Sequence, residues 1–218
     1  LQAVVAWGLV MQAANRDVQL RVAFQPTVSG IDWHVVGVEA LVRWQDPALG
    51  LLMPKAFVQA AEELGLIIDV GRFVLREACR QALAWIDAGA ADFAMAVNVS
   101  PLQLQRPEFV DDVRMALAEY KLPSRCIELE LTESVMMENI DRMVTTMQTL
   151  KALGVRIALD DFGTGYSSLN YLRRFPIDCL KIDQSFVRDV TSDAGSAGIC
   201  RAVIALATRA RLSASVRK

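Results

Sequence analysis

Six polar side chains interrupt segments of the sequence that are otherwise apolar and rich in β-branched residues. They are Glu39, Asn98, Glu130, Asp160, Asp161 and Lys181. Each lies inside, or directly after, one of five successive strand candidates, at or near its carboxyl end. In barrels and open α/β sheets the carboxyl ends of strands converge on one site. A structural ion pair would explain one such residue, but five consecutive strands favour a shared functional site.

The chemistry of these side chains points to a divalent cation. Carboxylates gathered without a counter-charge repel one another and lose solvation, and a metal ion offsets both costs. Glu, Asn and Asp offer only oxygen ligands, which favours magnesium or manganese over zinc. His34 is the single histidine of the chain, which excludes a histidine-rich zinc site.

The adjacent pair Asp160 and Asp161 adds a second indication. At a strand-to-loop turn both carboxylates can face one pocket and hold two metals ~3.5–4 Å apart, an arrangement that serves in-line attack on a phosphodiester. A helix cap or a turn explains an Asp-Asp pair equally well when it is taken alone. The loop that follows, Phe162 to Ser168, contains two glycines and several hydroxyls, so its backbone can approach a ligand closely.

The apolar segments alternate with helical patterns, which predicts βαβ units and a parallel sheet. The strand candidates are Arg21–Gln25, Val35–Val42, Phe93–Val99, Ile127–Leu131, Val155–Leu159 and Cys179–Ile182. The helix candidates are Pro54–Leu64, Gly71–Ala88, Pro107–Lys121, Asn139–Leu153 and Ala194–Arg211. Pro54 and Pro107 are expected in first helical turns, and Gly154 is expected as a left-handed C-terminal cap.

Composition limits the classes of protein. The 218 residues are 53% hydrophobic with a formal charge of -2, which suits one globular domain and gives no basic surface for duplex nucleic acid. The four cysteines form no CxxC pair and are expected to be buried free thiols.

No apolar run approaches the ~20 residues that span a bilayer. We expect a cytoplasmic protein, or the cytoplasmic part of a membrane-anchored one. We also expect a leading helix or linker over residues 1–19 and one domain over residues 20–218.

Seven motifs in order resemble the EAL-domain family of cyclic di-GMP phosphodiesterases. They are Phe24-Gln25-Pro26, Gly37 to Trp44, Ala61 to Ile67, Asn98-Val99-Ser100, Glu130 to Ser134, Asp160 to Ser168 and Lys181 to Val187. The resemblance implies an α/β fold, a TIM-type (β/α) barrel modified with an antiparallel first strand. It also implies hydrolysis of cyclic di-GMP to linear pGpG with Mg²⁺ or Mn²⁺ in a two-metal site.

The resemblance also implies a role for each matching residue. Glu39, Asn98, Glu130 and Asp160 resemble ligands of a first metal, and Asp160 and Asp161 those of a second. Lys181 resembles the group that positions or deprotonates the attacking water, with Asp183 in support. Gln25 and Arg43 resemble substrate contacts, and Glu133 resembles the anchor of the loop from Asp161 to Ser168. Simpler interpretations are packing for Trp44 and Phe162, a surface position for Lys181, and a solvated helix face for Glu62 and Glu63.

The end of the chain departs from the family pattern. After the last helix the family continues with a strand that carries a glutamate ligand, whereas this sequence reads Leu212 to Lys218. A barrel typically takes ~250 residues. We therefore expect a barrel truncated after the sixth βα unit, with impaired turnover and an open edge that favours a homodimer. An upstream sensory or diguanylate cyclase domain is also expected. The alternatives are a non-catalytic domain that binds cyclic di-GMP or a partner, and a different metal-dependent barrel enzyme.

Overall fold

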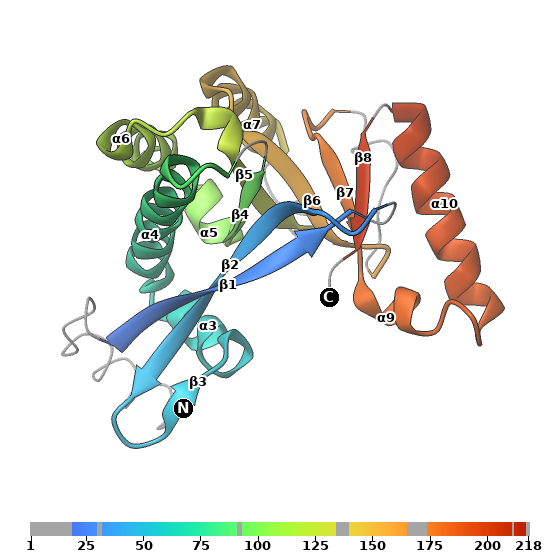
Figure 1. Cartoon of the computed structure of the whole chain (residues 1–218), viewed down its shortest axis with the longest axis horizontal. Helices are drawn as coiled ribbons and strands as arrows, with labels where there is room; N and C mark the ends of the chain where they lie inside the picture. The colour runs from blue at the N-terminus through green and yellow to red at the C-terminus, as the bar shows by residue number, and fades with distance from the viewer. Residues whose placement is uncertain are drawn as a thin grey trace. The chain divides into compact units, whose positions relative to one another are not determined.

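The computed structural model describes residues 19–29, 32–90, 93–133, 140–164, 174–210 and 212–216 (Figure 1). The chain divides into two compact units, Leu1–Ile127 and Glu128–Lys218. The predicted leading helix or linker lies, apart from Gln19, outside the described residues. So does the predicted loop beyond Thr164.

The strands of the first unit combine antiparallel and parallel pairing. They are β1 (Leu20–Val28), β2 (Val35–Asp46), β3 (Gly50–Leu52) and β4 (Ala94–Val99). Strand β1 pairs with β2 in the antiparallel direction, with Gln25 opposite Glu39. Strand β2 pairs in parallel with β4, with Glu39 opposite Ala96. The antiparallel first strand expected from the sequence is therefore confirmed.

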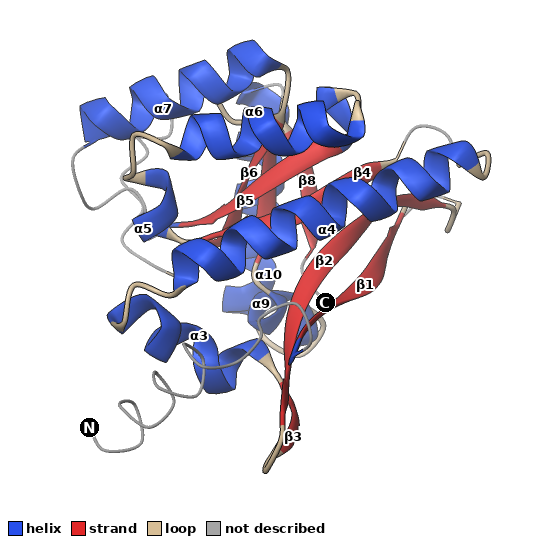
Figure 2. Cartoon of the chain, turned by 90° about the vertical axis from the view of Figure 1, so that its left-hand side faces the viewer, coloured by secondary structure: helices blue, strands red, loops and turns tan. Residues whose placement is uncertain are grey.

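Helices of the first unit cover one side of these strands. They are α3 (Pro54–Glu63), α4 (Ile67–Asp87), α5 (Pro101–Leu104), α6 (Phe109–Tyr120) and the 3-10 turn η1 (Ser124–Cys126). Figure 2 shows α4 lying along β2 and β4, against which it buries an apolar face that includes Val74 and Ala78. Pro54 occupies the first turn of α3, as predicted. The prediction for Pro107 is wrong, because α6 begins two residues later and Pro107 lies in the preceding turn.

The second unit is a parallel βα arrangement. Its strands are β5 (Ile127–Thr132), β6 (Arg156–Phe162), β7 (Cys179–Ile182) and β8 (Ser213–Val216), each paired in parallel with the next. Its helices are α7 (Ile140–Leu153), α9 (Gln184–Arg188) and α10 (Ala194–Ala210). Gly154 follows α7 with φ 92°, the left-handed cap that the sequence predicts.

The two faces of the second sheet differ sharply in composition. The register places Glu128, Glu130, Ala158 and Asp160 on one face and leucines and isoleucines on the other. The apolar face packs against helices through side chains that include Met143 and Met147 of α7 and Val203 of α10. Both faces of β5 and β6 are largely buried, which is why the alternation of charge on these strands matters for function.

Of the eight strands in the described part of the chain, six were predicted and two were not. Strand β3 has three residues and strand β8 has four, in the segment Ser213–Val216 that the sequence analysis left without structure. Serine and alanine dominate β8, so it lacks the apolar pattern that reveals a strand. Its pairing with β7, with Ser215 opposite Lys181, supplies the order that the local sequence does not.

The four cysteines have the buried, unbridged state that the sequence predicts. All four cysteines are buried free thiols. Burial raises the pKa of Cys79 to about 12, so this thiol is protonated at neutral pH. In the part of the chain that the structure describes, no helix combines the length and apolar character that crossing a membrane requires.

Candidate active site

A carboxylate and an amide form the first of two polar clusters. Glu39 lies in the middle of β2 and is 9% exposed. Asn98 lies near the end of β4, and its Nδ2 donates a hydrogen bond of 2.7 Å to Glu39 Oε1. The bond uses a donor of the amide, so the carbonyl oxygen of Asn98 keeps its capacity to accept. The cluster joins side chains from two neighbouring strands, and their predicted role as metal ligands stays a prediction.

The two expected substrate contacts lie on the same strand pair. Gln25 on β1 is directly opposite Glu39, so the two side chains share one face of the sheet. Arg43 on β2 is half-buried and opposite Arg21, and its Nη1 donates 2.9 Å to the carbonyl of Val42. Arg21 likewise donates 3.0 Å from its Nη1 to the carbonyl of Leu20, so two arginines stand in one cross-strand position.

The second cluster is built on an irregularity in β6. Between the pairs Leu159–Leu180 and Phe162–Ile182 the register shifts, so that Asp160 and Asp161 together stand opposite Lys181. Asp161 has a left-handed backbone with φ 53°, which is uncommon for a residue other than glycine. Such a bulge interrupts the alternation of faces and re-aims side chains. Strained backbone of this kind concentrates at functional sites.

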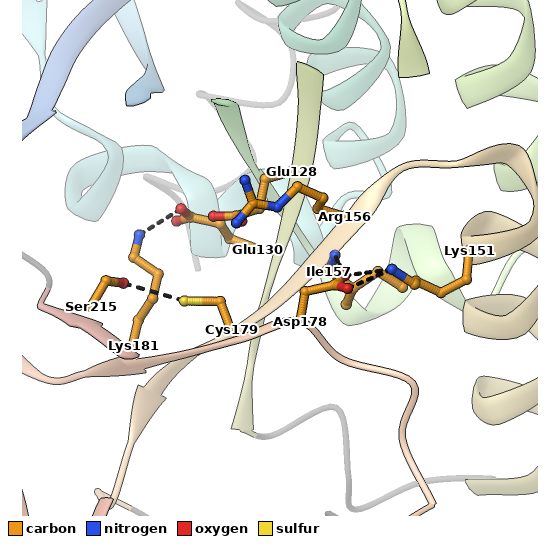
Figure 3. A network of polar contacts seen from close by, with 9 residues as sticks. All are labelled: Glu128, Glu130, Lys151, Arg156, Ile157, Asp178, Cys179, Lys181 and Ser215. Atoms are coloured by element: carbon orange, nitrogen blue, oxygen red, sulfur yellow. Dashed lines mark hydrogen bonds and ion pairs between the residues drawn. The ribbon is translucent and has the colours of Figure 1, made fainter. Parts of the chain in front are cut away.

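Lys181 and Glu130 form a buried ion pair in the same cluster (Figure 3). Lys181 Nζ lies 2.5 Å from Glu130 Oε1, and the two side chains are 8% and 1% exposed. Asp160 is completely buried. The interpretation of Lys181 as a surface lysine is therefore wrong, because its apolar neighbours on β7 bury it. Within this unit the cluster carries more negative than positive charge.

Glu133 and Asp183 flank the second cluster in the chain, whereas Trp44 belongs to the first unit. Glu133, directly after β5, accepts a hydrogen bond of 3.3 Å from the backbone N–H of Gly163 through Oε2. Asp183 caps α9, because its Oδ1 accepts a hydrogen bond of 2.8 Å from the backbone N–H of Ser185. Trp44 is buried and packs edge-on against Phe57, and Phe162 is also buried, in agreement with packing roles.

A second network in Figure 3 ties the opposite ends of these strands together. Asp178, just before β7, accepts hydrogen bonds from Lys151 Nζ at 2.6 and 2.8 Å and from Ile157 N at 2.8 Å. Arg156 lies 3.2 Å from Glu128, on the strand face that also carries Glu130. Burial raises the pKa of Glu128, and the nearby Arg156 only partly opposes this. These contacts hold the strands that carry the second cluster.

The donor set fits a hard divalent cation in its chemistry. The carboxylates and the amide of the two clusters offer a cation only oxygen ligands, and the buried carboxylates gain from a compact positive charge. Among the residues that the structure describes, no three His, Cys, Asp or Glu side chains are grouped closely enough to hold a metal ion. In the second cluster the Lys181 ammonium holds Glu130 Oε1.

Two contacts of Ser100, which follows Asn98 by two residues, were not predicted from the sequence. Glu62, assigned with Glu63 to a solvated face, is half-buried and accepts a hydrogen bond of 2.6 Å from Ser100 Oγ. Gln103 is buried, and its Oε1 accepts a hydrogen bond of 3.1 Å from Ser100 N. The pattern Ser-x-x-Gln from Ser100 to Gln103 is a capping-box signature that could have revealed this contact.

The fold and these clusters define a class, the α/β barrel-type domains with polar groups at their strand ends. The EAL domain family profile matches residues 10–216 of the chain, and the chain belongs to that family.

Three relatives show how close the likeness is. MucR of Pseudomonas aeruginosa, named a bifunctional diguanylate cyclase and cyclic di-GMP phosphodiesterase, is 45% identical over 89% of this chain and 28% of its own length. The cyclic di-GMP phosphodiesterase NbdA of the same organism is 43% identical over 93% of the chain and 26% of its own length. The solved PaMucR phosphodiesterase in complex with c-di-GMP matches with a TM-score of 0.92 and 41% identity, covering 99% of this chain and 86% of that one. The chain thus spans less than a third of the two curated relatives.

Proposed function

We propose that this domain hydrolyses cyclic di-GMP to linear pGpG in bacterial second-messenger signalling. The observation that carries the proposal is the bulge that sets Asp160 and Asp161 against Lys181 beside the buried Glu130. The naming of MucR and NbdA as cyclic di-GMP phosphodiesterases supports the choice of substrate. In the reaction a water oxygen bonds to one phosphorus, and the bond from that phosphorus to the ribose O3′ breaks. The O3′ gains a proton and leaves as a hydroxyl.

The protein residues in this proposal bind, orient and exchange protons. Lys181 Nζ donates to the attacking water and orients it, with Glu130 fixing the direction of the ammonium group. Asp183 supports this position from the start of α9. Arg43 binds a phosphate through its two-pronged guanidinium, and Gln25 hydrogen-bonds the nucleotide from the neighbouring strand. Glu133 holds the backbone that follows Asp161.

Two Mg²⁺ or Mn²⁺ ions complete the proposal. Glu39, Asn98, Glu130, Asp160 and Asp161 would hold these ions, with Asp160 available to both. When bound, the ions neutralise phosphate charge and lower the pKa of bound water. The oxygen-only donor set and the burial of Asp160 favour this assignment over a metal-free site.

Incubating the purified chain with cyclic di-GMP and Mn²⁺, and separating the products by chromatography, tests the activity. We expect linear pGpG from the unaltered chain and a loss of roughly 100-fold or more in Asp160→Asn, on the scale of removing one group that stabilises transition-state charge. Glu63→Gln is the matched control, because Glu63 is an exposed carboxylate that contacts Gln59 of its own helix.

The outcomes separate the parts of the proposal. Product formation that survives in Asp160→Asn at the unaltered rate overturns the metal assignment. Tight binding of cyclic di-GMP without any product overturns hydrolysis and favours the regulatory alternative. The impaired turnover, homodimer and upstream domain that the sequence suggested stay predictions, and the rate measured in this experiment addresses the first of them.

A further inference from the structure

Ser100 is the centre of a small hydrogen-bond network just beyond the carboxyl end of β4. Its hydroxyl donates to Glu62 Oε1 on α3 at 2.6 Å and accepts from Leu102 N at 3.3 Å. Its backbone N–H donates to Gln103 Oε1 at 3.1 Å. Three elements, α3, β4 and α5, are therefore tied together at one residue, and Figure 2 shows these helices grouped beside α4.

A glycine in the second turn of α4, Gly71, makes room for this network. A Cβ atom on Gly71 would lie 1.9 Å from Gln103 Nε2 and 2.5 Å from its Cδ. Gln103 is buried and bonded to Ser100, so its amide has little freedom to move away. A helix-interior glycine costs stability relative to alanine. The close approach of the Gln103 amide is the physical reason for a glycine at this position.

The network stands two residues from Asn98. Ser100 keeps an extended backbone with φ -69° and ψ 145°, so Asn98 and Ser100 fall on the same side of β4. Asn98 Nδ2 reaches Glu39 Oε1 at 2.7 Å, a bond that depends on the exact height and direction of the strand end. A contact that fixes Ser100 from α3 therefore also fixes the direction of the Asn98 amide.

We infer that Glu62 is a positioning residue for Asn98, acting through Ser100. The inference rests on the proposed function only for the metal role of Asn98. Neutral acceptors would satisfy a serine hydroxyl, but a carboxylate makes a shorter and stronger bond with it. Glu62 thereby holds the end of β4 in the orientation that presents the Asn98 carbonyl oxygen. A role in capping α5 alone predicts a change in melting temperature and nothing at Asn98.

Two measurements on the full chain distinguish positioning from capping. The first is the ¹⁵N NMR signal of the Asn98 side-chain amide, assigned by its loss in Asn98→Ala. The second is the Kd for Mn²⁺ from titration calorimetry. The variants are Glu62→Ala, Ser100→Ala and Gly71→Ala, and the last displaces the Gln103 amide without touching Glu62. Glu63→Ala is the matched control, since Glu63 is the adjacent, exposed carboxylate.

Positioning predicts a shifted Asn98 amide signal and a Kd for Mn²⁺ about 10-fold weaker in the three variants, the usual effect of removing a group that orients a ligand. Glu63→Ala should match the unaltered chain. Glu62→Gln retains a carbonyl acceptor and should restore the Kd to within about 3-fold. The double variant Glu62→Ala/Ser100→Ala should be no weaker than the worse single variant, because both changes remove the same contact.

Failure of this inference and failure of the proposed function give different results. An unchanged Asn98 signal in folded Glu62→Ala overturns the positioning role. So does an unchanged Kd in Glu62→Ala when Asn98→Ala binds Mn²⁺ weakly. If the unaltered chain binds no Mn²⁺, the proposed metal site is overturned, and so is the expected change in the Kd for Mn²⁺. A shifted Asn98 signal in Glu62→Ala would still support the contact from Glu62 through Ser100 to Asn98.

Discussion

The two units stabilise a buried carboxylate in different ways. In the first unit Glu39 is 9% exposed and accepts a hydrogen bond from the neutral amide of Asn98. In the second, Glu130 is 2% exposed and forms an ion pair with Lys181, itself buried. Glu130 is almost fully desolvated and contacts a full positive charge, whereas Glu39 is more exposed and contacts a dipole. The comparison indicates that deeper burial of a carboxylate demands stronger charge compensation.

The two clusters would also respond differently to a bound cation. The amide of Asn98 can turn its carbonyl oxygen to a cation and still hold Glu39. Lys181 competes with any cation for Glu130, so its ammonium group must stay close to that carboxylate or move onto a bound water. The proposed function therefore assigns ligand binding to the first cluster, and ligand binding together with orientation of the attacking water to the second.

Lys181→Met should give the largest effect on stability. The change leaves the carboxylate of Glu130 buried beside an apolar side chain, and breaking a buried ion pair in this way costs about 3–5 kcal/mol. The free energy of unfolding from urea titration measures it. Adding Glu130→Gln to Lys181→Met should recover more than half of the loss. A single variant within about 1 kcal/mol of the unaltered chain would contradict the account of Glu130.

Asn98→Ala should have a smaller effect, about 2 kcal/mol, because Glu39 loses one hydrogen-bond donor but is less deeply buried. Asn98→Asp should be worse than Asn98→Ala, since it places a second carboxylate 2.7 Å from the first, at the distance of the present hydrogen bond. The same urea titration checks both variants. Equal losses for Asn98→Ala and Lys181→Met would remove the difference between the two units.

The strand ends opposite the second cluster offer a third test. Asp178→Ala removes the acceptor of Ile157 N and of Lys151 Nζ, and should cost about 1.5 kcal/mol. The matched contact in the first unit joins Arg72 Nε and Asp112 Oδ1 at 2.9 Å, with the arginine side chain 42% exposed. Arg72→Ala should cost only about 0.5 kcal/mol. Thermal melting of both variants ranks them, and the reverse order would refute the importance of Asp178.

Glu128→Gln should give the smallest effect, and a pH-dependent one. Burial raises the pKa of Glu128 above its ordinary value of 4.5. The stability that protonated Glu128 contributes is present below that value and is lost as the pH rises through the raised pKa. Glutamine cannot ionise, so Glu128→Gln does not lose this stability at high pH. The Tm of the variant minus the Tm of the unaltered chain should therefore be larger at pH 8 than at pH 5, by about 3 °C at most. An identical difference in Tm at both pH values would show that Glu128 does not titrate in this range.

Much of the fold followed from local patterns. Apart from Arg156, the run from Val155 to Leu159 is apolar, and β6 is indeed a strand that is largely buried on both faces. Strand β8 could not be predicted, because Ser213–Val216 has no apolar periodicity and is ordered by its pairing with β7. Helix α6 begins at Phe109, two residues after Pro107, because Pro107 and Glu108 form a turn. The proline alone therefore does not determine where the helix begins.

The candidate site divides in the same way. The sequence by itself determined which residue types lie at the strand ends, because the period of a strand and the cost of burying charge can be read locally. Only the tertiary structure decided that Asp160 and Asp161 share a bulge opposite Lys181, that Lys181 Nζ reaches Glu130, and that Glu62 reaches Ser100. The physical reason is that register shifts and contacts between separate elements depend on how those elements pack, and no local sequence pattern encodes that packing.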